Sequence, residues 1–165
     1  MTVRSILSAL AVVALLTNLA PAAESADVEY LSDHVDKRVV SVSQQWGGLG
    51  INTAVKPADR EAMPLRIKDQ TYQRGLGHHA TGEIVVDLAG QYKTFDVEVG
   101  IQWQGGTDQA SAVCQIFVDD EKVFDSGVMR ENDPPKKASL PVAGADELRL
   151  VATDADDGPA QTEPR

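Results

Sequence analysis

Two adjacent histidines, His78 and His79, are the side chains of this 165-residue chain best suited to polar chemistry. Neighbouring residues on a β-strand point to opposite faces, so the two rings cannot readily bind one metal ion. His79 has two interpretations: a polar anchor inside the fold, hydrogen-bonded to a backbone group, or a contact to a ligand hydroxyl. We expect His78 to be exposed.

The two tryptophans, Trp46 and Trp103, are the candidates for an aromatic binding surface. A flat indole matches the apolar C–H face of a sugar ring, while polar neighbours bind the hydroxyls. Trp103 lies in the polar stretch 102–109 and is our first choice for a ligand contact, with Gln102 as a hydroxyl-binding neighbour. Packing at the edge of the core is the alternative for Trp103 and the favoured interpretation for Trp46.

An acidic stretch near the end of the chain contains Asp154, Asp156 and Asp157. Calcium prefers carboxylate and carbonyl oxygens, so these residues are a candidate site for a structural calcium ion. The spacing differs from that of an EF-hand, and a solvated acidic turn is the alternative. We expect no other cofactor.

Signatures of catalysis are missing from the sequence. No nucleophile elbow, zinc motif or phosphate loop is present. Gly75 and Gly77 lack the spacing of a dinucleotide loop, and they favour a turn or bulge. We predict that the protein is not an enzyme. A small glycoside-active enzyme is the weaker alternative, since any two of the many carboxylates could converge.

The elements that must position these residues are short strands. Apolar and polar residues alternate in 83–88, 94–101 and 147–153, as in strands with one buried face, and 111–118 has apolar residues on both faces. Turn signals separate the strands at Ala89-Gly90, Gly105-Gly106 and Asp119-Asp120. Residues 58–62 could form one short helical turn. We expect a single core that contains Ile84, Val86, Phe95, Val97, Val99, Ile101, Leu148 and Leu150.

Many short, regularly punctuated strands without a long helical pattern predict an all-β fold. The expected architecture is an antiparallel β-sandwich of the jelly-roll type. A length of 165 residues suits one domain.

Residues 1–22 have the pattern of a signal peptide. Arg4 precedes the apolar run 6–16, and Ala20-Pro21-Ala22 offers small residues for cleavage. The run is too short to span a bilayer, which needs about 20 apolar residues. We therefore expect export, to a secreted or periplasmic location. The alternative is a buried N-terminal helix.

The formal net charge of -10 makes the protein acidic. An acidic surface repels phosphate backbones, so nucleic acid is an unfavourable partner. Cys114 is the single cysteine. It excludes an intrachain disulfide, and we expect it to be a small core residue.

Several segments, taken together and in order, resemble the NPCBM family, also called carbohydrate-binding module family 51. They include Gln45-Trp46-Gly47 and the run from Tyr72 through Gly75-Leu76-Gly77-His78-His79-Ala80. Further matches are Tyr30-Leu31-Ser32-Asp33, Pro64-Leu65-Arg66-Ile67, Ile84 to Leu88, Gly90 to Phe95, Val97 to Gly100, Val118-Asp119-Asp120, Val123 to Gly127, Leu148 to Asp154, and Asp157-Gly158.

The resemblance implies a galactose-binding-like jelly roll over residues 27–165, of a kind often attached to secreted glycoside hydrolases. It implies binding of galactose-type glycans, with His79 at the family's histidine. Two positions depart from the family pattern. Gln102 replaces a usual Asp, and the stretch after Gly158 lacks the family's closing segment. An exported protein-interaction or structural module that has lost sugar binding is therefore the alternative.

Overall fold

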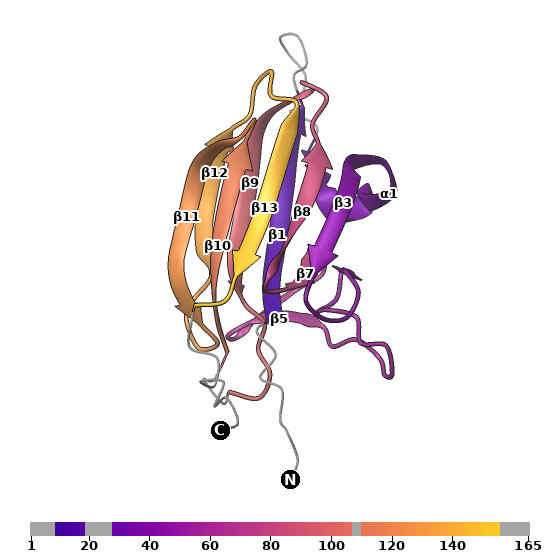
Figure 1. Cartoon of the computed structure of the whole chain (residues 1–165), viewed down its shortest axis with the longest axis vertical. Helices are drawn as coiled ribbons and strands as arrows, with labels where there is room; N and C mark the ends of the chain where they lie inside the picture. Colours follow the sequence, from indigo (N-terminus) through magenta and orange to yellow (C-terminus); the bar gives the residue numbers. More distant parts are fainter. Residues whose placement is uncertain (1–8, 19–27, 107–109, 156–165) are drawn as a thin grey trace, which may run out of the picture.

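The protein is a sandwich of two antiparallel β-sheets (Figure 1), seen in a computed structural model that describes residues 9–18, 28–106 and 110–155. Sheet A has, in spatial order, β12 (Lys136–Pro141), β9 (Tyr92–Ile101), β1 (Ala9–Asn18), β7 (Leu76–His79) and β4 (Gly50–Ile51), with β2 (Val28–Tyr30) paired to β1. Sheet B has β11 (Glu121–Arg130), β10 (Ser111–Val118), β13 (Glu147–Thr153), β8 (Gly82–Asp87) and β3 (Val39–Gln44).

Three small elements complete the described chain. They are the ribbon of β5 (Leu65–Ile67) and β6 (Gln70–Tyr72), the 3-10 turn η1 (Leu31–Asp33), and the single-turn helix α1 (Val35–Arg38). The predicted antiparallel β-sandwich is confirmed, since every strand pair in the described chain is antiparallel.

The predicted strands appear as β8, β9, β10 and β13. The turn at Asp119-Asp120 has positive φ at both residues, 45° and 69°, as expected for a tight hairpin. The expected helical turn at 58–62 is wrong, because these residues form bends and coil without helix. Pro57 and Pro64 bracket a stretch too short to offset the cost of helix nucleation.

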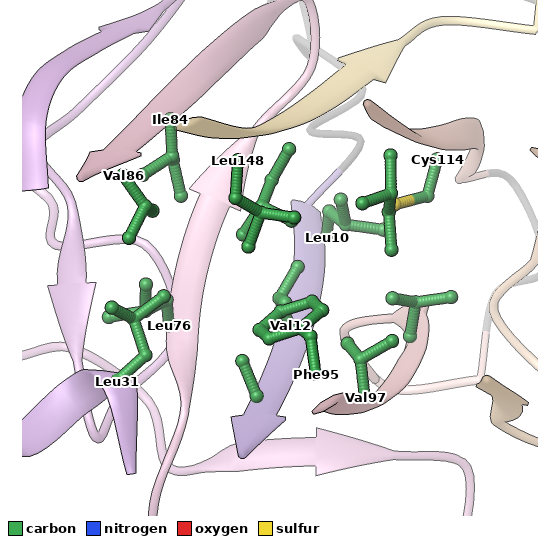
Figure 2. Packing of buried hydrophobic residues seen from close by; sticks show 14 of the residues in the cluster. Leu10, Val12, Leu31, Leu76, Ile84, Val86, Phe95, Val97, Cys114 and Leu148 are labelled. Carbon is green, nitrogen blue, oxygen red and sulfur yellow. The ribbon is translucent and has the colours of Figure 1, made fainter. Parts of the chain in front are cut away.

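The core lies between the two sheets, and all eight side chains predicted for it belong to one buried cluster. Figure 2 shows part of this cluster, with Phe95 and Val97 of β9 near Leu148 of β13. Cys114 is fully buried in the same cluster, and burial raises the pKa of its thiol to about 12. The expectation of a small core cysteine is therefore confirmed.

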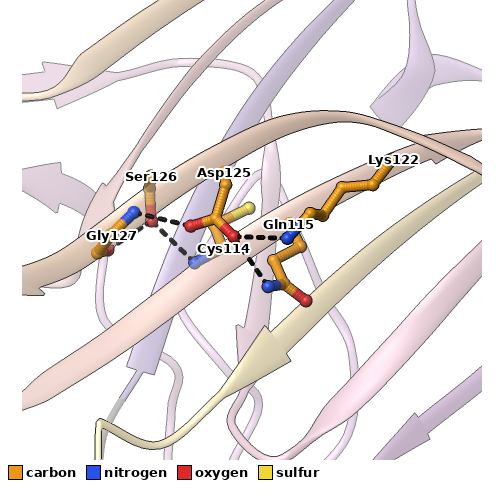
Figure 3. A network of polar contacts seen from close by, with 6 residues as sticks. All are labelled: Cys114, Gln115, Lys122, Asp125, Ser126 and Gly127. Atoms are coloured by element: carbon orange, nitrogen blue, oxygen red, sulfur yellow. Dashed lines mark hydrogen bonds and ion pairs between the residues drawn. The ribbon is translucent and has the colours of Figure 1, made fainter.

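A polar network holds an irregularity between β10 and β11 (Figure 3). The hydroxyl of Ser126 accepts a 2.8 Å hydrogen bond from the Cys114 amide. The Asp125 carboxylate accepts hydrogen bonds from the amide of Gly127, from Lys122 and from Gln115. These donors, the Gly127 amide first, lower the pKa of Asp125 to about 2. The network satisfies backbone groups that the shift in register leaves unpaired.

The N-terminal apolar run enters the sandwich as β1, in the middle of sheet A. Leu10, Val12, Ala14 and Leu16 are at most 3% exposed and belong to the main core cluster. The alternative of a buried helix is therefore correct in burial and wrong in secondary structure. The sequence of this segment has the pattern of a signal peptide, whereas the structure places it as a central strand of sheet A.

A row of small residues crosses the outer face of sheet A. Ala11 of β1 lies opposite Gly77 of β7 on one side and Gly100 of β9 on the other. A Cβ atom at Gly100 would lie 2.5 Å from Ile67 Cγ2, and one at Gly77 would overlap the backbone at Ala54. Glycine at these positions lets the β5–β6 ribbon and the preceding loop lie directly on the sheet.

Four arginines of the described chain stack on aromatic rings. Such contacts are attractive because the face of the ring carries partial negative charge. The guanidinium-to-centroid distances are 5.2 Å for Arg38 over Tyr92, 4.0 Å for Arg66 over Trp103, 4.6 Å for Arg74 over Tyr30 and 4.8 Å for Arg149 over Phe117.

The Phe95→Ala substitution tests the core. It should lower the free energy of unfolding by about 3–5 kcal/mol, because the ring is fully buried and its loss leaves a cavity. Urea denaturation measures this change. Val128→Ala on β11 is the control: Val128 is 49% exposed, and the expected change is within about 0.5 kcal/mol. A Phe95→Ala protein as stable as the wild type would contradict the observed register of β9.

Candidate functional site

The candidate residues lie at one end of the sandwich, the lower end in Figure 1. β3 ends there at Gln44, where β8 begins. β7 and β9 also end there, and Leu10 of β1 lies opposite both His78 and Ile101. The loops that follow β3 and β9 carry Trp46 and Trp103, respectively, so both tryptophans belong to this end.

His78 is the polar anchor inside the sandwich. The expectation that it is exposed is wrong, since it is 1% exposed and faces the same side of β7 as Leu76. Its Nε2 lies 2.7 Å from the carbonyl oxygen of Ser43 in sheet B. A carbonyl can only accept, so Nε2 carries the proton. Burial lowers the pKa of His78, which favours the neutral ring.

His79 points to the opposite face, toward Trp46. The two ring centroids are 6.0 Å apart and the rings are tilted by 53°. His79 is 6% exposed, and its buried Nδ1 has no hydrogen bond of regular geometry in the described chain, although the Ala80 backbone lies near enough to the ring to oppose the effect of burial on its pKa. Burial lowers the pKa of His79, so the ring is neutral near pH 7. This buried nitrogen therefore lies beside a half-buried indole without a regular hydrogen bond.

Gln44 positions this pair, and the sequence analysis did not identify it. Its side-chain Oε1 accepts a hydrogen bond from the His79 amide at 3.4 Å, and its Nε2 donates to the carbonyl oxygen of Trp46 at 3.0 Å. One amide thus links the end of β7 to the loop after β3. A glutamine at the end of a strand carries no sequence signal for such a role.

Trp46 lies outside the buried core cluster and is half-buried. The favoured expectation, packing at the edge of the core, agrees with its contact to the buried His79 ring, although Trp46 does not join the core cluster. The loop around it is closed by two 2.9 Å backbone hydrogen bonds between Gly48 and Lys56. The indole is held at the surface by a short closed loop and the His79 ring.

Trp103 is also half-buried, and the guanidinium of Arg66 lies 4.0 Å above the centre of its ring. The Trp103 amide donates a 2.8 Å hydrogen bond to the Arg66 carbonyl oxygen. One face of the indole is therefore covered by the β5–β6 ribbon, and a sugar could stack only on the other face.

Gln102 is 2% exposed and serves the backbone rather than the surface. Its Oε1 accepts from the Arg66 amide at 3.1 Å, and its Nε2 donates to the carbonyl oxygens of Pro64 and Trp103 at 3.0 and 3.1 Å. This side chain fastens the ribbon to the end of β9. A hydroxyl contact would require breaking these bonds, so we leave Gln102 out of the proposed site.

Glu131 anchors the loop after Trp103, and the sequence analysis did not identify it either. Its side chain is fully buried, and Oε1 accepts hydrogen bonds from the amides of Gln104 and Gly106. A buried carboxylate bound by backbone amides holds a loop in one conformation. Residues 107–109, the end of the polar stretch, lie outside the described residues.

The candidate residues form two groups rather than one cluster. His79 is the last residue of β7 and contacts Trp46, whereas Gln102 and Trp103 follow the end of β9. Strand β1 lies between β7 and β9. His78 and Ile101 flank Leu10, and two strand spacings separate their backbones by about 10 Å.

The proposed calcium ligands are only partly described. Asp154 is exposed, and Asp156 and Asp157 lie outside the described residues. Within residues 9–18, 28–106 and 110–155, no three His, Cys, Asp or Glu side chains converge as metal ligands would. Over the same residues, no helix has the length and apolar character needed to cross a membrane.

The family model described as the NPCBM/NEW2 domain matches residues 27–163. No curated protein sequence matches the chain.

Solved structures resemble most of the chain. The CBM51 of a Clostridium perfringens GH95 protein, in complex with methyl-galactose, has a TM-score of 0.67 and 30% identity over 79% of this chain and 89% of that one. The Clostridium perfringens ZmpB structure of the M60 catalytic domain with CBM51-1 and CBM51-2 has a TM-score of 0.69 and 27% identity, over 88% of this chain and 16% of that one. A ZmpB structure of CBM51-2 with GlcNAc, at 24% identity and a TM-score of 0.68, shares the fold over 92% of this chain and 35% of that one.

Acidification should weaken the fold through the buried histidines. Their folded-state pKa values lie below the ordinary value of 6.5, so the unfolded chain binds protons first as the pH falls. The free energy of unfolding should therefore be highest above the ordinary histidine pKa of about 6.5 and fall as the pH drops below it. His78→Gln, which keeps a donor for the Ser43 carbonyl, should flatten this slope in urea denaturation at several pH values. Equal slopes for the wild type and the variant would contradict this account.

Proposed function

Because the chain belongs to the NPCBM/NEW2 family of carbohydrate-binding modules, we propose that it is a non-catalytic module that binds galactose-type glycans at the Trp46–His79 end of the sandwich. The observation that carries the proposal is the buried Nδ1 of His79, which has no regular hydrogen bond, beside the half-buried Trp46 indole. A buried polar atom without a partner costs about 1–3 kcal/mol, which a ligand hydroxyl would offset.

The pair has the two features that a sugar site needs. The indole offers a flat apolar surface for the C–H face of the ring, and the neutral imidazole offers a hydrogen-bonding nitrogen. Since Nδ1 is buried beside the Trp46 ring, a hydroxyl reaches it only if the Trp46 side chain shifts. Binding should therefore change the environment of Trp46.

Galactose is the preferred sugar class because the CBM51 at 30% identity was solved with methyl-galactose. Catalysis is disfavoured by how the nearby carboxylates are used. Glu131 is buried and bound to backbone amides, and Asp154 is an exposed residue after β13. Glycoside hydrolysis needs two carboxyl groups that flank the scissile bond.

We also propose export, on the strength of Arg4, the apolar run and the small residues at Ala20-Pro21-Ala22. Export would bring the module to the compartment where glycans of other cells and of the environment are found.

Calorimetric titration with galactose-containing oligosaccharides tests the sugar site. Trp46→Ala should weaken binding about tenfold to a hundredfold, which corresponds to about 1.4–2.8 kcal/mol. The melting temperature should change little, because Trp46 lies outside the core cluster. Trp103→Ala should cause a smaller loss, since Arg66 already covers one face of that ring.

Phe117→Ala is the matched control. Phe117 also lies under an arginine, but it is on β10 at the end of the sandwich opposite to the candidate site. Binding by this variant should equal that of the wild type. The proposal fails if the wild type binds none of the galactose-containing oligosaccharides. A loss only in Trp103→Ala would move the site to the loop after β9.

Mass spectrometry of protein collected from the periplasm or medium of an expressing bacterium tests export. The expected N-terminus lies near Ala23, because the small residues before it fit signal peptidase. Cytoplasmic protein that retains Met1 at its N-terminus would contradict the proposal.

A further inference from the structure

The outer face of sheet A carries a groove of about 420 Å³, which the Trp46–His79 site does not use. Ser139 of β12, Asp96 of β9 and Tyr30 of β2 lie in one row across the sheet, and β1 passes between the last two. Side chains in one such row project from the same face. The row crosses β9 about 17 Å along the strand from Ile101, so the groove is separate from the end of the sandwich that carries the tryptophans.

A second row forms the floor of the groove. Lys137 lies opposite Glu98, and Glu98 lies opposite Val13 of β1. The Glu98 carboxylate is engaged at both oxygens, since Oε1 accepts from Lys137 Nζ at 2.6 Å and Oε2 accepts from the Tyr72 hydroxyl at 2.7 Å. Val13 is half-buried and leaves apolar surface beside this ion pair. The floor is therefore partly apolar, with its polar groups held in place.

Tyr30 forms the aromatic wall of the groove. The guanidinium of Arg74 lies 4.6 Å from the centre of the Tyr30 ring, and its Nε lies 2.8 Å from the Asp33 carboxylate. These contacts hold the ring in one position before any ligand binds. An aromatic surface that is already ordered loses little entropy on binding.

Asp96 is the polar group of the groove that the fold itself does not use. Its side chain is half-buried, and its carboxylate makes no hydrogen bond or ion pair with the residues that the structure describes. Glu98, by contrast, has its oxygens occupied. An ionised carboxylate only accepts hydrogen bonds, so Asp96 is free to bind a ligand that donates them.

The combination of groups favours a neutral sugar as the ligand. A pyranose ring has an apolar C–H face that suits Tyr30 and Val13, and its neighbouring hydroxyls can both donate to Asp96. The charged lining residues are Asp96, Glu98 and Lys137, which leaves one negative charge in excess. A ligand with its own carboxylate is therefore disfavoured.

We propose that this groove is a second glycan-binding site, in which a neutral pyranose packs on Tyr30 and Val13 and donates two hydroxyls to Asp96. The class of ligand rests on the proposed function, whereas the location and residues of the groove are independent of the Trp46–His79 site. The proposal concerns the chain with β1 in place, because Val13 is part of the floor. Two sites on one module would increase avidity for a surface that displays many glycans.

The test protein is the full chain, expressed in the cytoplasm so that β1 is retained, with Trp46→Ala to disable the other site. It is titrated with the methyl glycosides of galactose, glucose and mannose by calorimetry and by ¹⁵N NMR. At least one glycoside should bind with 1:1 stoichiometry and shift the amide signals of residues 96–98 and 137–139 most. Adding Asp96→Ala should weaken this binding at least tenfold. The melting temperature should not fall, because Asp96 makes no contact that the fold needs.

Two further measurements test the role of charge. Asp146→Ala is the matched control, since it removes the same charge from an exposed position in the loop before β13 and should leave the affinity unchanged. Methyl glucuronide should bind at least tenfold more weakly than methyl glucoside, because its carboxylate would meet Asp96. Asp96→Asn should narrow this difference.

The proposal is overturned if no glycoside binds the Trp46→Ala protein, or if Asp96→Ala and Asp146→Ala bind equally well. Binding of Nα-acetyl-lysine amide without binding of any glycoside would assign the groove to a cationic side chain and would also overturn it. The two sites fail separately. Binding that is lost with Trp46→Ala alone removes the groove, and binding that is lost with Asp96→Ala alone removes the Trp46–His79 site.

Discussion

The hydrogen bonding of β1 along both of its edges is the constraint on which the rest of the molecule depends. It sets the distance between β7 and β9, and thereby the distance between the two loops that carry the tryptophans. His79 lies opposite Ala9, and Gln102 follows the residue opposite Leu10. The relative positions of the candidate residues therefore depend on β1, although β1 contributes no side chain to the site.

Period-two alternation was sufficient to predict β8, β9 and β13 and the core side chains that they carry. Phe95 to Ile101 and Ile84 to Leu88 each have one apolar face, and burial of that face leaves a single register. The same logic failed for β1, whose apolar residues lie on both faces because the ribbon covers the outer one. A strand buried on both sides has no polar alternation to identify it.

The site was predicted less well than the fold. One reason is that the sequence does not show which face of a strand a given residue occupies. Adjacent residues such as His78 and His79 exchange roles when the strand is turned over, and nothing local to the sequence fixes which ring faces the core. For Gln102 and Trp103, contacts with residues far away in the sequence determine how exposed the side chain is. Gln102 is buried because the ribbon crosses the end of β9, and Trp103 is covered because Arg66 lies on that ribbon. Contacts between residues 36 or more positions apart leave no pattern in either segment.

Two side-chain amides and one carboxylate hold the loops at the candidate-site end of the sandwich in place. Gln44 and Gln102 each link two backbone segments, and Glu131 holds the loop that follows Trp103. Because these side chains are already hydrogen-bonded, the loops are ordered before any ligand arrives. Preorganisation of this kind reduces the entropy lost on binding.

The arginines stacked on Tyr30, Tyr92, Trp103 and Phe117 also affect how the protein discriminates between ligands by charge. Each places its cation against a ring of the protein itself, on a chain whose net charge is -10. An acidic sugar approaching the protein should therefore meet a repulsive field, and these four cations are already stacked on rings of the chain. A neutral sugar ring meets no such barrier, and its encounter with the protein should depend little on salt concentration.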